Sequence, residues 1–555
     1  AAVSAAPPPP ADSTISGSLI IEHHETAELA APPPVVLLYR LEAGHGLPKS
    51  QIYRMSPPSW AQWTTATPSL TFSFADVPPG SYAVLAYQPA TAASASPPTV
   101  DPTKPLGWFA DHERDCVGSP SDVCVTPVQA SSHNIVIRLS APTAFDKDHP
   151  IKSANSTLWF FEGIPVLMLT GIFTERSEAH GYLAAPQIYD LIRYFLLEDR
   201  VRSCRRYEHE VLPNIRRRIM VGDRLYMSAE AMLRGMARRV PLDDPRMIVP
   251  CLNRPLTAAD LLALQLYSDV PRLLNSYNPE LPTASCTQFM AWGSATSSGS
   301  LIAGRNMDGE VDVRKVTVTH FVMVAHTPTD PITKGVRWIS FMWPGFIGTS
   351  SGVNENGLYV MENAGCSPLK DDPASFTGYI PLRDLISGVL EGLGPLQGSL
   401  TSEAISTLMG PQMAAQFSSH GGACLSGCLL YFASPDSAML WEGSAYGGDV
   451  RQAGDADPYY PTVLTGSNHN LKYHYTNDSV CDGKPTSTSS LWRYKAGSNA
   501  LDSLLRTRGP LTELDFVDLL QRVAEGETEH SIVVMPKERK IGVAVALPAA
   551  TMWDA

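Results

Sequence analysis

Short apolar segments with an alternating pattern dominate roughly the first quarter of the chain and predict β-strands. Five stretches place β-branched and aromatic residues at every second position or in short apolar runs, between Pro, Gly and Ser residues. They are residues 16–24, 33–41, 69–77, 80–88 and 134–142. Strands at this spacing, without a helical pattern between them, favour a β-sandwich. We therefore assign residues 1–13 to a Pro/Ala-rich tail and residues 14–142 to an accessory β-sandwich domain.

The pattern then changes to apolar residues at three- and four-residue spacing, which is typical of amphipathic helices. Residues 189–212, 227–240 and 257–274 follow it, and Thr257 with Asp260 forms a helix-start signal before the last of them. These stretches predict a helical segment over residues 143–285. Basic residues there could face an acidic lipid surface, although a solvated helix face with some ion pairs is the favoured interpretation. They are Arg200, Arg202, Arg205, Arg206, Arg216, Arg217 and Arg218.

After Cys286 the chain mixes both patterns. Apolar strand-like runs cover residues 315–327, 335–343, 356–364, 427–434, 437–443 and 462–467, and residues 531–548 form a closing hairpin pattern. Helical patterns cover residues 381–393, 401–409 and 512–524. Strands interrupted by amphipathic helices favour an α+β fold with layered sheets and helices. We assign residues 286–555 to this second domain.

Composition narrows the class of protein. The chain has 555 residues, of which 44% are hydrophobic and 17% charged, so it can bury the cores of two or three domains. Its net charge of −13 argues against a nucleic acid as the main partner. No run of eighteen apolar residues predicts a transmembrane helix. No residue pattern calls for a cofactor or a metal ion.

The cysteines and the chain start bear on the compartment. Nine cysteines leave at least one thiol free if the others pair internally. Cys116 and Cys124 flank a polar loop suited to a local disulfide, and Cys424 with Cys428 offers a second local bridge or separate partners. Zinc would need further ligands at matched spacing. The Ala-rich start, AAVSAAPPPP, is typical of a chain cut behind small residues, which favours a secreted, periplasmic or lysosome-like lumenal location.

Two glycosylation sequons, Asn155-Ser156-Thr157 and Asn477-Asp478-Ser479, would suit a secreted glycoprotein. About two are expected by chance in a chain this rich in Ser and Thr, so they add little.

The segment ASCTQFMAWGSATSSGSLIAGRNMDGE, residues 284–310, carries the most chemical information. A cysteine opens a short strand, a Gly/Ser-rich turn follows, and a second strand ends in Arg305 and Asp308. Such a hairpin brings Arg305 and Asp308 back toward Cys286. A guanidinium near a thiol lowers the pKa of the thiol, which would suit an activated nucleophile, but many hairpins end in Arg-Asn or Asp because of the turn alone.

This hairpin resembles the nucleophile hairpin of the N-terminal-nucleophile (Ntn) cysteine hydrolases, which include acid ceramidase, N-acylethanolamine amidases and penicillin acyltransferases. Further stretches resemble family motifs in the same order over about residues 158–550. They are HGYLAAPQIYDLIRYFL, ADLLALQLYSDV, IGTSSGVNENGLYVMEN, LTGSNHN and SSLWRY. The resemblance implies a four-layer αββα sandwich. The stretch FADVPPGSYAVLAYQ separately resembles prealbumin-like and carboxypeptidase-regulatory-like β-sandwich modules.

The resemblance also implies site roles. The chain would cleave itself between Ser285 and Cys286, after which the Cys286 thiol attacks an amide carbonyl and its own amine serves as base. Arg305 and Asp308 would hold the thiolate and the amine, and Asn468 would donate to the oxyanion. The resemblance assigns two further charged residues less specifically: Glu362 as a carboxylate near the scissile bond and Arg493 as a substrate-binding or site-shaping cation. The expected activity is that of an amidohydrolase or acyltransferase.

Competing interpretations remain for each residue. Cys286 could be an inert thiol or half of a disulfide, Arg305 and Asp308 a structural ion pair, and Asn468 a turn residue; Glu362 and Arg493 could be ordinary charges. A papain-like pairing of Cys286 with a histidine is disfavoured by the residues around the cysteine; the candidate histidines are His320, His326, His469 and His474.

The partner expected is a small N-acyl substrate, with a lipid amide as the first choice and peptide-like and β-lactam-like amides left open. The two cleaved chains would stay associated, and the β-sandwich would suit homo-oligomer formation or assembly. The alternative function is an extracellular structural or binding protein that keeps the hydrolase fold.

Overall fold

The structure is a computed structural model that describes most of the chain. The described residues are 14–21, 32–41, 47–48, 60–89, 106–108, 122–123, 125–139, 143–148, 150–201, 203–218, 222–249, 252–266, 286–308, 314–330, 335–365, 381–392, 427–444, 447–456, 460–472, 485–525 and 528–546. Large sheets and helices share the chain, so the expected α+β class is confirmed.

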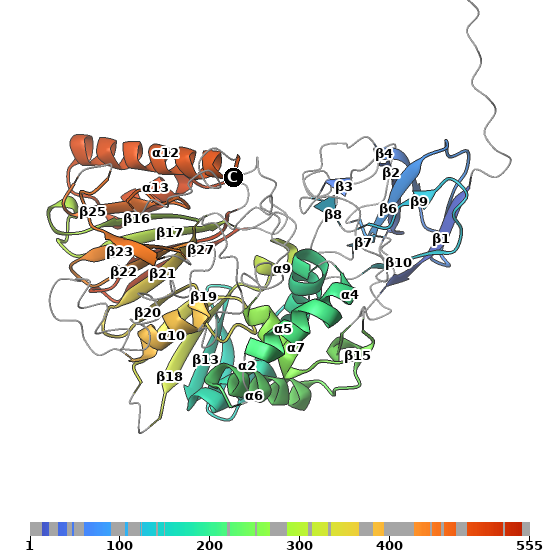
Figure 1. Ribbon diagram of the computed structural model, residues 1–555, viewed down its shortest axis with the longest axis horizontal. Coiled ribbons are helices and arrows are strands. Elements are labelled where there is room, and N and C mark those ends of the chain that lie inside the picture. Colours follow the sequence, from blue (N-terminus) through green and yellow to red (C-terminus); the bar gives the residue numbers. More distant parts are fainter. Residues whose placement is uncertain are drawn as a thin grey trace, which may run out of the picture.

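All five strands predicted in the N-terminal region form. Three of them, β1 (Ile15–Ile21), β5 (Thr71–Phe74) and β10 (Ile135–Leu139), build a three-stranded sheet. A second sheet contains β2 (Val35–Arg40), β4 (Trp60–Thr65), β6 (Ser81–Tyr87), β7 (Leu106–Trp108) and β9 (Val128–Gln129). One apolar core joins residues of both sheets, including Leu19, Val36, Phe72 and Val84. These strands gather at one end of the molecule (Figure 1).

The Pro-Gly turn before the Tyr-bearing strand has a clear structural role. The ring of Tyr82 is fully buried, and its hydroxyl donates to the carbonyl oxygen of Pro78 at 2.7 Å. This bond spans the turn and fixes the start of β6, because a buried hydroxyl needs an acceptor.

The helical region begins with α2 (Phe173–Leu183) and α3 (Ala185–Asp190), and the chain continues as a π-helix over Leu191–Val201. Then come α4 (Cys204–Arg206), α5 (Leu212–Arg218), α6 (Arg224–Arg239) and α7 (Ala258–Gln265), which starts with the expected capping box of Thr257 and Asp260. Helices α2 and α6 approach closely, since a Cβ on Gly181 would lie 2.0 Å from the carbonyl oxygen of Met232.

The expectation of a purely helical segment over residues 143–285 is incomplete. Strands β11 (Ile151–Ser153), β12 (Ser156–Phe161) and β13 (Ile164–Gly171) precede the helices. A two-residue turn at Glu162 and Gly163, both with positive φ, joins β12 to β13. The apolar run of β13 then pairs in parallel with β18 (Val322–Pro328), which lies beyond Cys286 in the sequence.

Strand β13 thereby enters a ten-stranded sheet in the order β11-β12-β13-β18-β19-β20-β21-β22-β23-β24. The further strands are β19 (Trp338–Met342), β20 (Ser351–Asn354), β21 (Tyr359–Ala364), β22 (Cys428–Ala433), β23 (Ala438–Ser444) and β24 (Gly447–Arg451). Helix α10 (Leu382–Gly392) packs on this sheet through an apolar core that includes Leu385, Val360 and Leu430.

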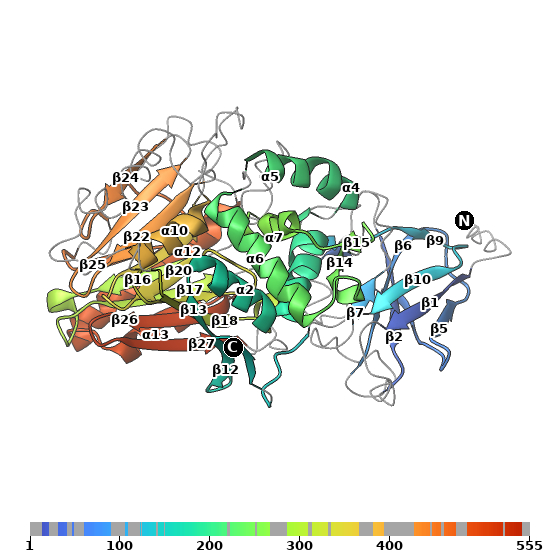
Figure 2. The same cartoon turned by 90° about the horizontal axis from the view of Figure 1, so that it is seen from below.

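A five-stranded antiparallel sheet carries the predicted nucleophile. Its order is β25-β16-β17-β26-β27, with β16 (Cys286–Ala291), β17 (Ile302–Asp308), β25 (Val463–Gly466), β26 (Thr528–Met535) and β27 (Lys540–Val545). Side chains alternate along the first hairpin: Met290 and Ala303 face a core shared with the ten-stranded sheet, whereas Phe289 and Ile302 face the helices α12 (Pro485–Arg508) and α13 (Glu513–Arg522). Figure 1 shows these two helices above the five-stranded sheet, and Figure 2 shows the helices α2, α6 and α7 between the sheets and the N-terminal strands.

One predicted strand begins later in the structure than the sequence pattern indicates. Residues 315–327 were expected to be a strand, but Arg314–Thr317 form the short helix α9 before β18 begins. Tertiary contacts override the β-branched pattern there, because Val316 is fully buried and the Thr317 hydroxyl donates to Glu529. The helix predicted over residues 401–409 lies outside the described residues.

No helix among the described residues is long and apolar enough to cross a membrane.

Candidate active site

Three strand ends meet at Cys286. Strands β17 and β25 both run antiparallel to β16, so their last residues lie beside its start. Cys286 is paired with Met307 in register, and on its other edge β17 pairs with β26, where a bulge between Met307 and Asp308 shifts the register before Asp308 pairs with Thr528. On the other side β25 ends at Gly466, two residues before Asn468. The order of the strands thus brings together residues separated by up to 182 positions.

The thiol of Cys286 is free and buried, with 2% of the residue exposed. Arg305 Nη2 lies 3.3 Å from Cys286 Sγ, and the thioether sulfur of Met307 lies 3.6 Å from it. The guanidinium is held in place by the carbonyl oxygen of Glu362 at 2.9 Å and by the hydroxyl of Ser351 at 3.5 Å. The predicted approach of Arg305 to Cys286 is therefore present.

The expected lowering of the Cys286 pKa is wrong for this state of the chain. Burial raises the pKa of the thiol above its ordinary value, and the charge of Arg305 offsets this only in part. The thiol is therefore protonated at neutral pH, and an attack on a carbonyl needs a base to accept its proton.

Asn468 contacts the main-chain nitrogen of Cys286. Its Oδ1 accepts from Cys286 N at 2.9 Å and from Arg493 Nη2 at 2.8 Å, while its Nδ2 donates to the carbonyl oxygen of Ala364 at 2.7 Å. The backbone nitrogen of Asn468 donates to the hydroxyl of Ser490 on α12 at 2.8 Å. This side chain therefore orients the nitrogen that would become the amine after cleavage, and it is more than a turn residue.

Arg493 reaches the site from α12 and is fully buried. Its Nη1 donates to the carbonyl oxygen of Cys286 and to the hydroxyl of Thr287, both at 2.7 Å. Two carboxylates face it, Glu525 at 3.3 Å and Asp308 at 3.9 Å. Arg493 therefore lies beside the Cys286 carbonyl oxygen, where the predicted site-shaping cation would have to lie.

Asp308 is a buried carboxyl with an unusual proton affinity. The hydroxyl of Thr528 donates to its Oδ1 at 2.5 Å, whereas Oδ2 is buried without a hydrogen bond. Burial raises the pKa of Asp308 to about 7, although the positive charge of Arg493 opposes the shift. A group with this pKa changes its charge in the range where acid–base catalysis operates.

The raised pKa of Asp308 predicts how stability depends on pH. The protonated carboxyl contributes to the free energy of unfolding because the native chain holds its proton more tightly than the unfolded chain. This contribution is fully present at pH values below the ordinary carboxyl range and is lost as pH rises through about 7. In an uncleavable Cys286→Ala background, we expect Asp308→Asn to gain stability relative to its parent by on the order of 4 kcal/mol between pH 4 and pH 8. Urea unfolding at a series of pH values measures this difference.

Asp518, on the outer surface of α13, offers the matched control. Its carboxylate is paired with Arg522 at 3.0 Å in an exposed i,i+4 pair. Asp518→Asn should follow the parent across the pH range. Parallel curves for Asp308→Asn and its parent would show that the carboxyl is ionised in the native chain.

Glu362 contributes its main chain to the site. Its carbonyl oxygen holds Arg305, and its backbone nitrogen donates to the carbonyl oxygen of Ser350 at 2.8 Å. Its carboxylate makes no hydrogen bond or ion pair with the described residues. Thus the predicted carboxylate role at the scissile bond has no support in this geometry.

The adjacent Asn363 was not singled out in the sequence and is fully buried at the site. Its Nδ2 donates to the carbonyl oxygen of Ser467 at 2.8 Å and to that of Cys286 at 3.3 Å. Because side chains alternate along β21, either Glu362 or Asn363 of the motif YVMEN could face Cys286. The signal in the sequence for a site residue was therefore Asn363, a polar residue at a position that the alternation allows to be buried.

None of the three candidate histidines among the described residues is hydrogen-bonded to Cys286. His320 Nε2 lies 3.0 Å from Asp190, and the ring of His469 contacts the hydroxyls of Ser467 and Ser490. His326 is stacked on Trp338 with 3.8 Å between the rings. His474 lies outside the described residues, as do Ser285, Asn477, Cys116, Cys124 and Cys424 with the disulfides expected of them. No group of three or more His, Cys, Asp or Glu among the described residues is arranged to hold a metal ion.

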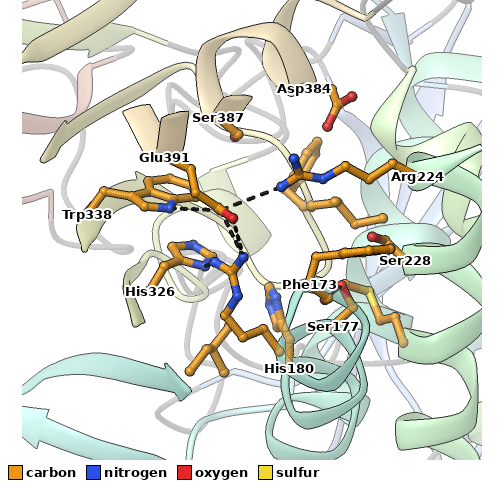
Figure 3. A pocket seen from close by; sticks show the side chains of 15 residues that line it. Phe173, Ser177, His180, Arg224, Ser228, His326, Trp338, Asp384, Ser387 and Glu391 are labelled. Carbon is orange, nitrogen blue, oxygen red and sulfur yellow. Dashed lines mark hydrogen bonds and ion pairs between the residues drawn. The ribbon is translucent and has the colours of Figure 1, made fainter. Parts of the chain in front are cut away.

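A pocket lined by charged and aromatic residues lies between α2, α6, α10 and the strands β18 and β19 (Figure 3), and none of the six candidate residues lines it. Arg176 donates from Nη2 to both oxygens of Glu391 at 2.8 Å, and Trp338 Nε1 donates to the same carboxylate at 3.3 Å. His180, from the motif HGYLAA, accepts from the backbone nitrogen of Gly345 at 3.0 Å. The Arg176–Glu391 and His180–Gly345 contacts thus join residues that precede Cys286 in the sequence to residues that follow it.

Comparisons with known proteins give limited likenesses. No protein-family model matches the chain, and no curated protein matches it. Similar solved structures include an N-acylethanolamine-hydrolyzing acid amidase ortholog from Caenorhabditis elegans, with 19% identity and a TM-score of 0.32 over 45% of this chain and 93% of that one. A mutant of the conjugated bile acid hydrolase from Clostridium perfringens has 11% identity and a TM-score of 0.29 over 48% and 94%. Penicillin V acylase from Agrobacterium tumefaciens has 14% identity and a TM-score of 0.30 over 47% and 83%.

Proposed function

We propose that this chain is an autoprocessing cysteine amidohydrolase or acyltransferase that cleaves an N-acyl bond through a thioester at Cys286. The observation that carries the proposal is the arrangement of three atoms of one residue. Arg305 contacts the thiol of Cys286, Asn468 accepts from its nitrogen, and Arg493 donates to its carbonyl oxygen. The backbone N–H and C=O of any buried residue need partners, but here side chains supply them, and a guanidinium also contacts the thiol, which a residue that only fills a core does not require.

Self-cleavage would come first. The Cys286 sulfur attacks the carbonyl carbon of Ser285, and the acyl group moves from the Cys286 nitrogen to its sulfur. Water then hydrolyses this thioester, which leaves a carboxylate on Ser285 and a free α-amine and thiol on Cys286. Asp308, whose pKa of about 7 lets it exchange a proton near neutral pH, is the candidate proton carrier for this step.

Substrate cleavage would follow the same path. The thiol attacks the amide carbonyl while the α-amine takes its proton, and that proton passes to the leaving amine. Asn468 orients the α-amine through Oδ1, and of the two N–H groups of its Nδ2, the one that does not donate to the Ala364 carbonyl is proposed to donate to the oxyanion. Water, or a second amine in an acyltransferase, then releases the acyl group from sulfur. Nucleophile and base lie on one residue, so their relative position needs no other element.

The fold proposed for residues 286–555, together with β11–β13, is the four-layer αββα sandwich of the Ntn hydrolases. The apolar core between the two sheets and the helices packed on their outer faces support it. Residues 14–142 are proposed to form the separate β-sandwich domain, whose two sheets share one core. Its role in assembly is a proposal as well.

The two cleaved chains are proposed to stay associated. Strands β13 and β18 pair over six residues across the cleavage point, and the buried Arg176–Glu391 ion pair also joins the two parts. Separating them would expose both partners of that pair and break a sheet in its interior.

Secretion or a lumenal compartment remains the proposed location, with disulfides and glycosylation. Asn155, the acceptor of the first sequon, is exposed in the turn between β11 and β12, where a glycan could be attached without disturbing the core. A lipid amide is the first substrate class to test, followed by peptide-like and β-lactam-like amides.

The intact mass of the reduced, denatured protein tests the proposal. Two fragments, residues 1–285 and 286–555, with masses that sum to the uncut chain plus one water, are expected. The cleaved protein should then hydrolyse at least one member of a panel of fluorogenic N-acyl amides. A single chain that persists after incubation at acidic and neutral pH would refute the activated hydrolase.

The alternative is a structural or binding protein that keeps this fold. The burial of Cys286 and its raised pKa favour it, because a buried thiol that keeps its proton is less reactive than a thiolate. Cleavage without turnover on any amide would support this alternative.

A further inference from the structure

A buried ion pair lies behind the loop that carries Asn468, which we define as the Asn468 loop (residues 467–472). Glu442 on β23 and Arg451 on β24 are joined by a bond of 2.7 Å between Arg451 Nε and Glu442 Oε1. Their side chains are 0% and 2% exposed, respectively. Neither residue stands out in the sequence: Glu442 is a single charge in β23, and Arg451 ends the edge strand β24 of the ten-stranded sheet.

The pair holds the Asn468 loop from both ends. Before the loop, Arg451 Nη2 donates to the carbonyl oxygen of Thr465 at 2.6 Å. At its end, the backbone nitrogens of Leu471 and Lys472 donate to the Glu442 carboxylate at 3.0 Å and 2.7 Å. Asn468 lies between these two anchor points, so its backbone position depends on both of them.

A gain in the stability of the fold does not by itself explain why the Glu442–Arg451 pair is buried here. A buried ion pair costs several kcal/mol of desolvation per charge, which its own attraction repays only in part, and apolar residues of similar size often stabilise a fold equally well. What apolar residues cannot do is accept two main-chain N–H groups and donate to a carbonyl in fixed directions. The geometry of the pair therefore serves to set the path of the loop.

The position of the loop matters because Asn468 makes short contacts on the other side. Its Oδ1 lies 2.9 Å from Cys286 N, and its backbone nitrogen is fixed by Ser490 on α12. A shift of about 1 Å at a positioned group can reduce a rate by a hundredfold. The Glu442–Arg451 pair controls this distance from the far side of the loop.

We propose that Glu442 and Arg451 are positioning residues for the chemistry at Cys286, and that they act through Asn468. This inference rests on the proposed amide-cleaving function. It assigns the residues no contact with the substrate.

The variant Glu442→Gln tests the inference. Glutamine keeps the size of the side chain, but its amide nitrogen would face the N–H groups of Leu471 and Lys472, two donors that need acceptors. We expect kcat for a fluorogenic N-decanoyl aminocoumarin amide to fall about tenfold with KM changed less than twofold, and self-cleavage to slow by a similar factor. Arg451→Lys, which cannot reach both Glu442 and Thr465, should show a smaller loss of the same kind.

Non-additivity separates positioning from a general structural role. Asn468→Ala alone should reduce kcat about a hundredfold. Glu442→Gln added to Asn468→Ala should cost less than a further twofold, because the residue it positions is gone. Glu355→Gln is the matched control: it makes the same change in an exposed ion pair, that of Glu355 with Arg337 on the same sheet, so kcat should not change.

The outcomes distinguish a failure of the positioning role from a failure of the proposed amide-cleaving function. An unchanged kcat in Glu442→Gln and Arg451→Lys, a loss expressed only in KM, or a full tenfold loss on top of Asn468→Ala would overturn the positioning role while the hydrolase stands. A wild-type protein that neither cleaves itself nor hydrolyses the amide refutes the proposed function, and the positioning role falls with it.

Discussion

The Cys286→Ala variant is expected to remain one uncut chain of 555 residues while the wild-type protein separates into two under denaturing conditions. The proposed cleavage needs the sulfur as nucleophile, and alanine offers none. Little else should change, because the contacts of the sulfur with Arg305 and Met307 are long, at 3.3 Å and 3.6 Å, and the backbone atoms of residue 286 keep their bonds to Asn468 and Arg493. Intact mass measurement after reduction separates the two results.

The Cys286→Ser variant sharpens this result. A hydroxyl can perform the same acyl shift, but it is a weaker nucleophile than a thiol, so we expect slow cleavage over days and a loss of amide hydrolysis of at least a hundredfold. Thermal unfolding of both variants, measured uncut, serves as the folding control. Cleavage of Cys286→Ala at Ser285 would mean that another group, or a contaminating protease, cuts the chain.

The hairpin of Cys286, Arg305 and Asp308 could be predicted from the sequence because its chemistry is local. Antiparallel strands joined by a short Gly/Ser-rich turn bring their two ends together whatever the rest of the fold does. The five strands of the N-terminal region and the capped start of α7 were predictable for the same reason. Their signals lie within ten or so residues.

Long-range partners were not predictable in this way. Thr528, which holds Asp308, follows it by 220 positions, and nothing near either residue marks the pair. The parallel pairing of β13 with β18 is equally distant in sequence, which is why residues 143–285 were expected to be helical only. Ordered motifs did place Asn468 and Arg493 near Cys286, but the atoms that each contacts depend on the packing of α12.

The pKa of Cys286 shows a different limit. A nearby guanidinium correctly predicts the sign of one electrostatic contribution, and Arg305 does favour the thiolate. The desolvation of the thiol depends on how completely the chain covers it, and burial prevails here. Burial at a strand end cannot be read from the residues of that strand.

The Arg493→Met variant is expected to lose about 3–5 kcal/mol of stability and to stop self-cleavage, because it breaks a fully buried network from its centre. The guanidinium donates to the Cys286 carbonyl oxygen, the Thr287 hydroxyl and Asn468 Oδ1, so three acceptors would each lose one donor. Methionine has similar length and fills the space, so the effect should come from the lost polar contacts. The urea midpoint, measured in the Cys286→Ala background, reports the change in stability.

The pH dependence of this loss identifies its cause. Arg493 is the main charge that holds the pKa of Asp308 down against burial, so without it the carboxyl should stay protonated to higher pH. The stability deficit of Arg493→Met should therefore be smallest near pH 4, where a protonated Asp308 needs no cation, and should grow as pH rises through about 7. Arg506→Met, on the exposed face of the same helix, should leave the midpoint unchanged at every pH. A stability deficit that is the same at pH 4 and pH 8 would assign the loss to packing and hydrogen bonds. It would also show that the charge of Arg493 does not set the pKa of Asp308.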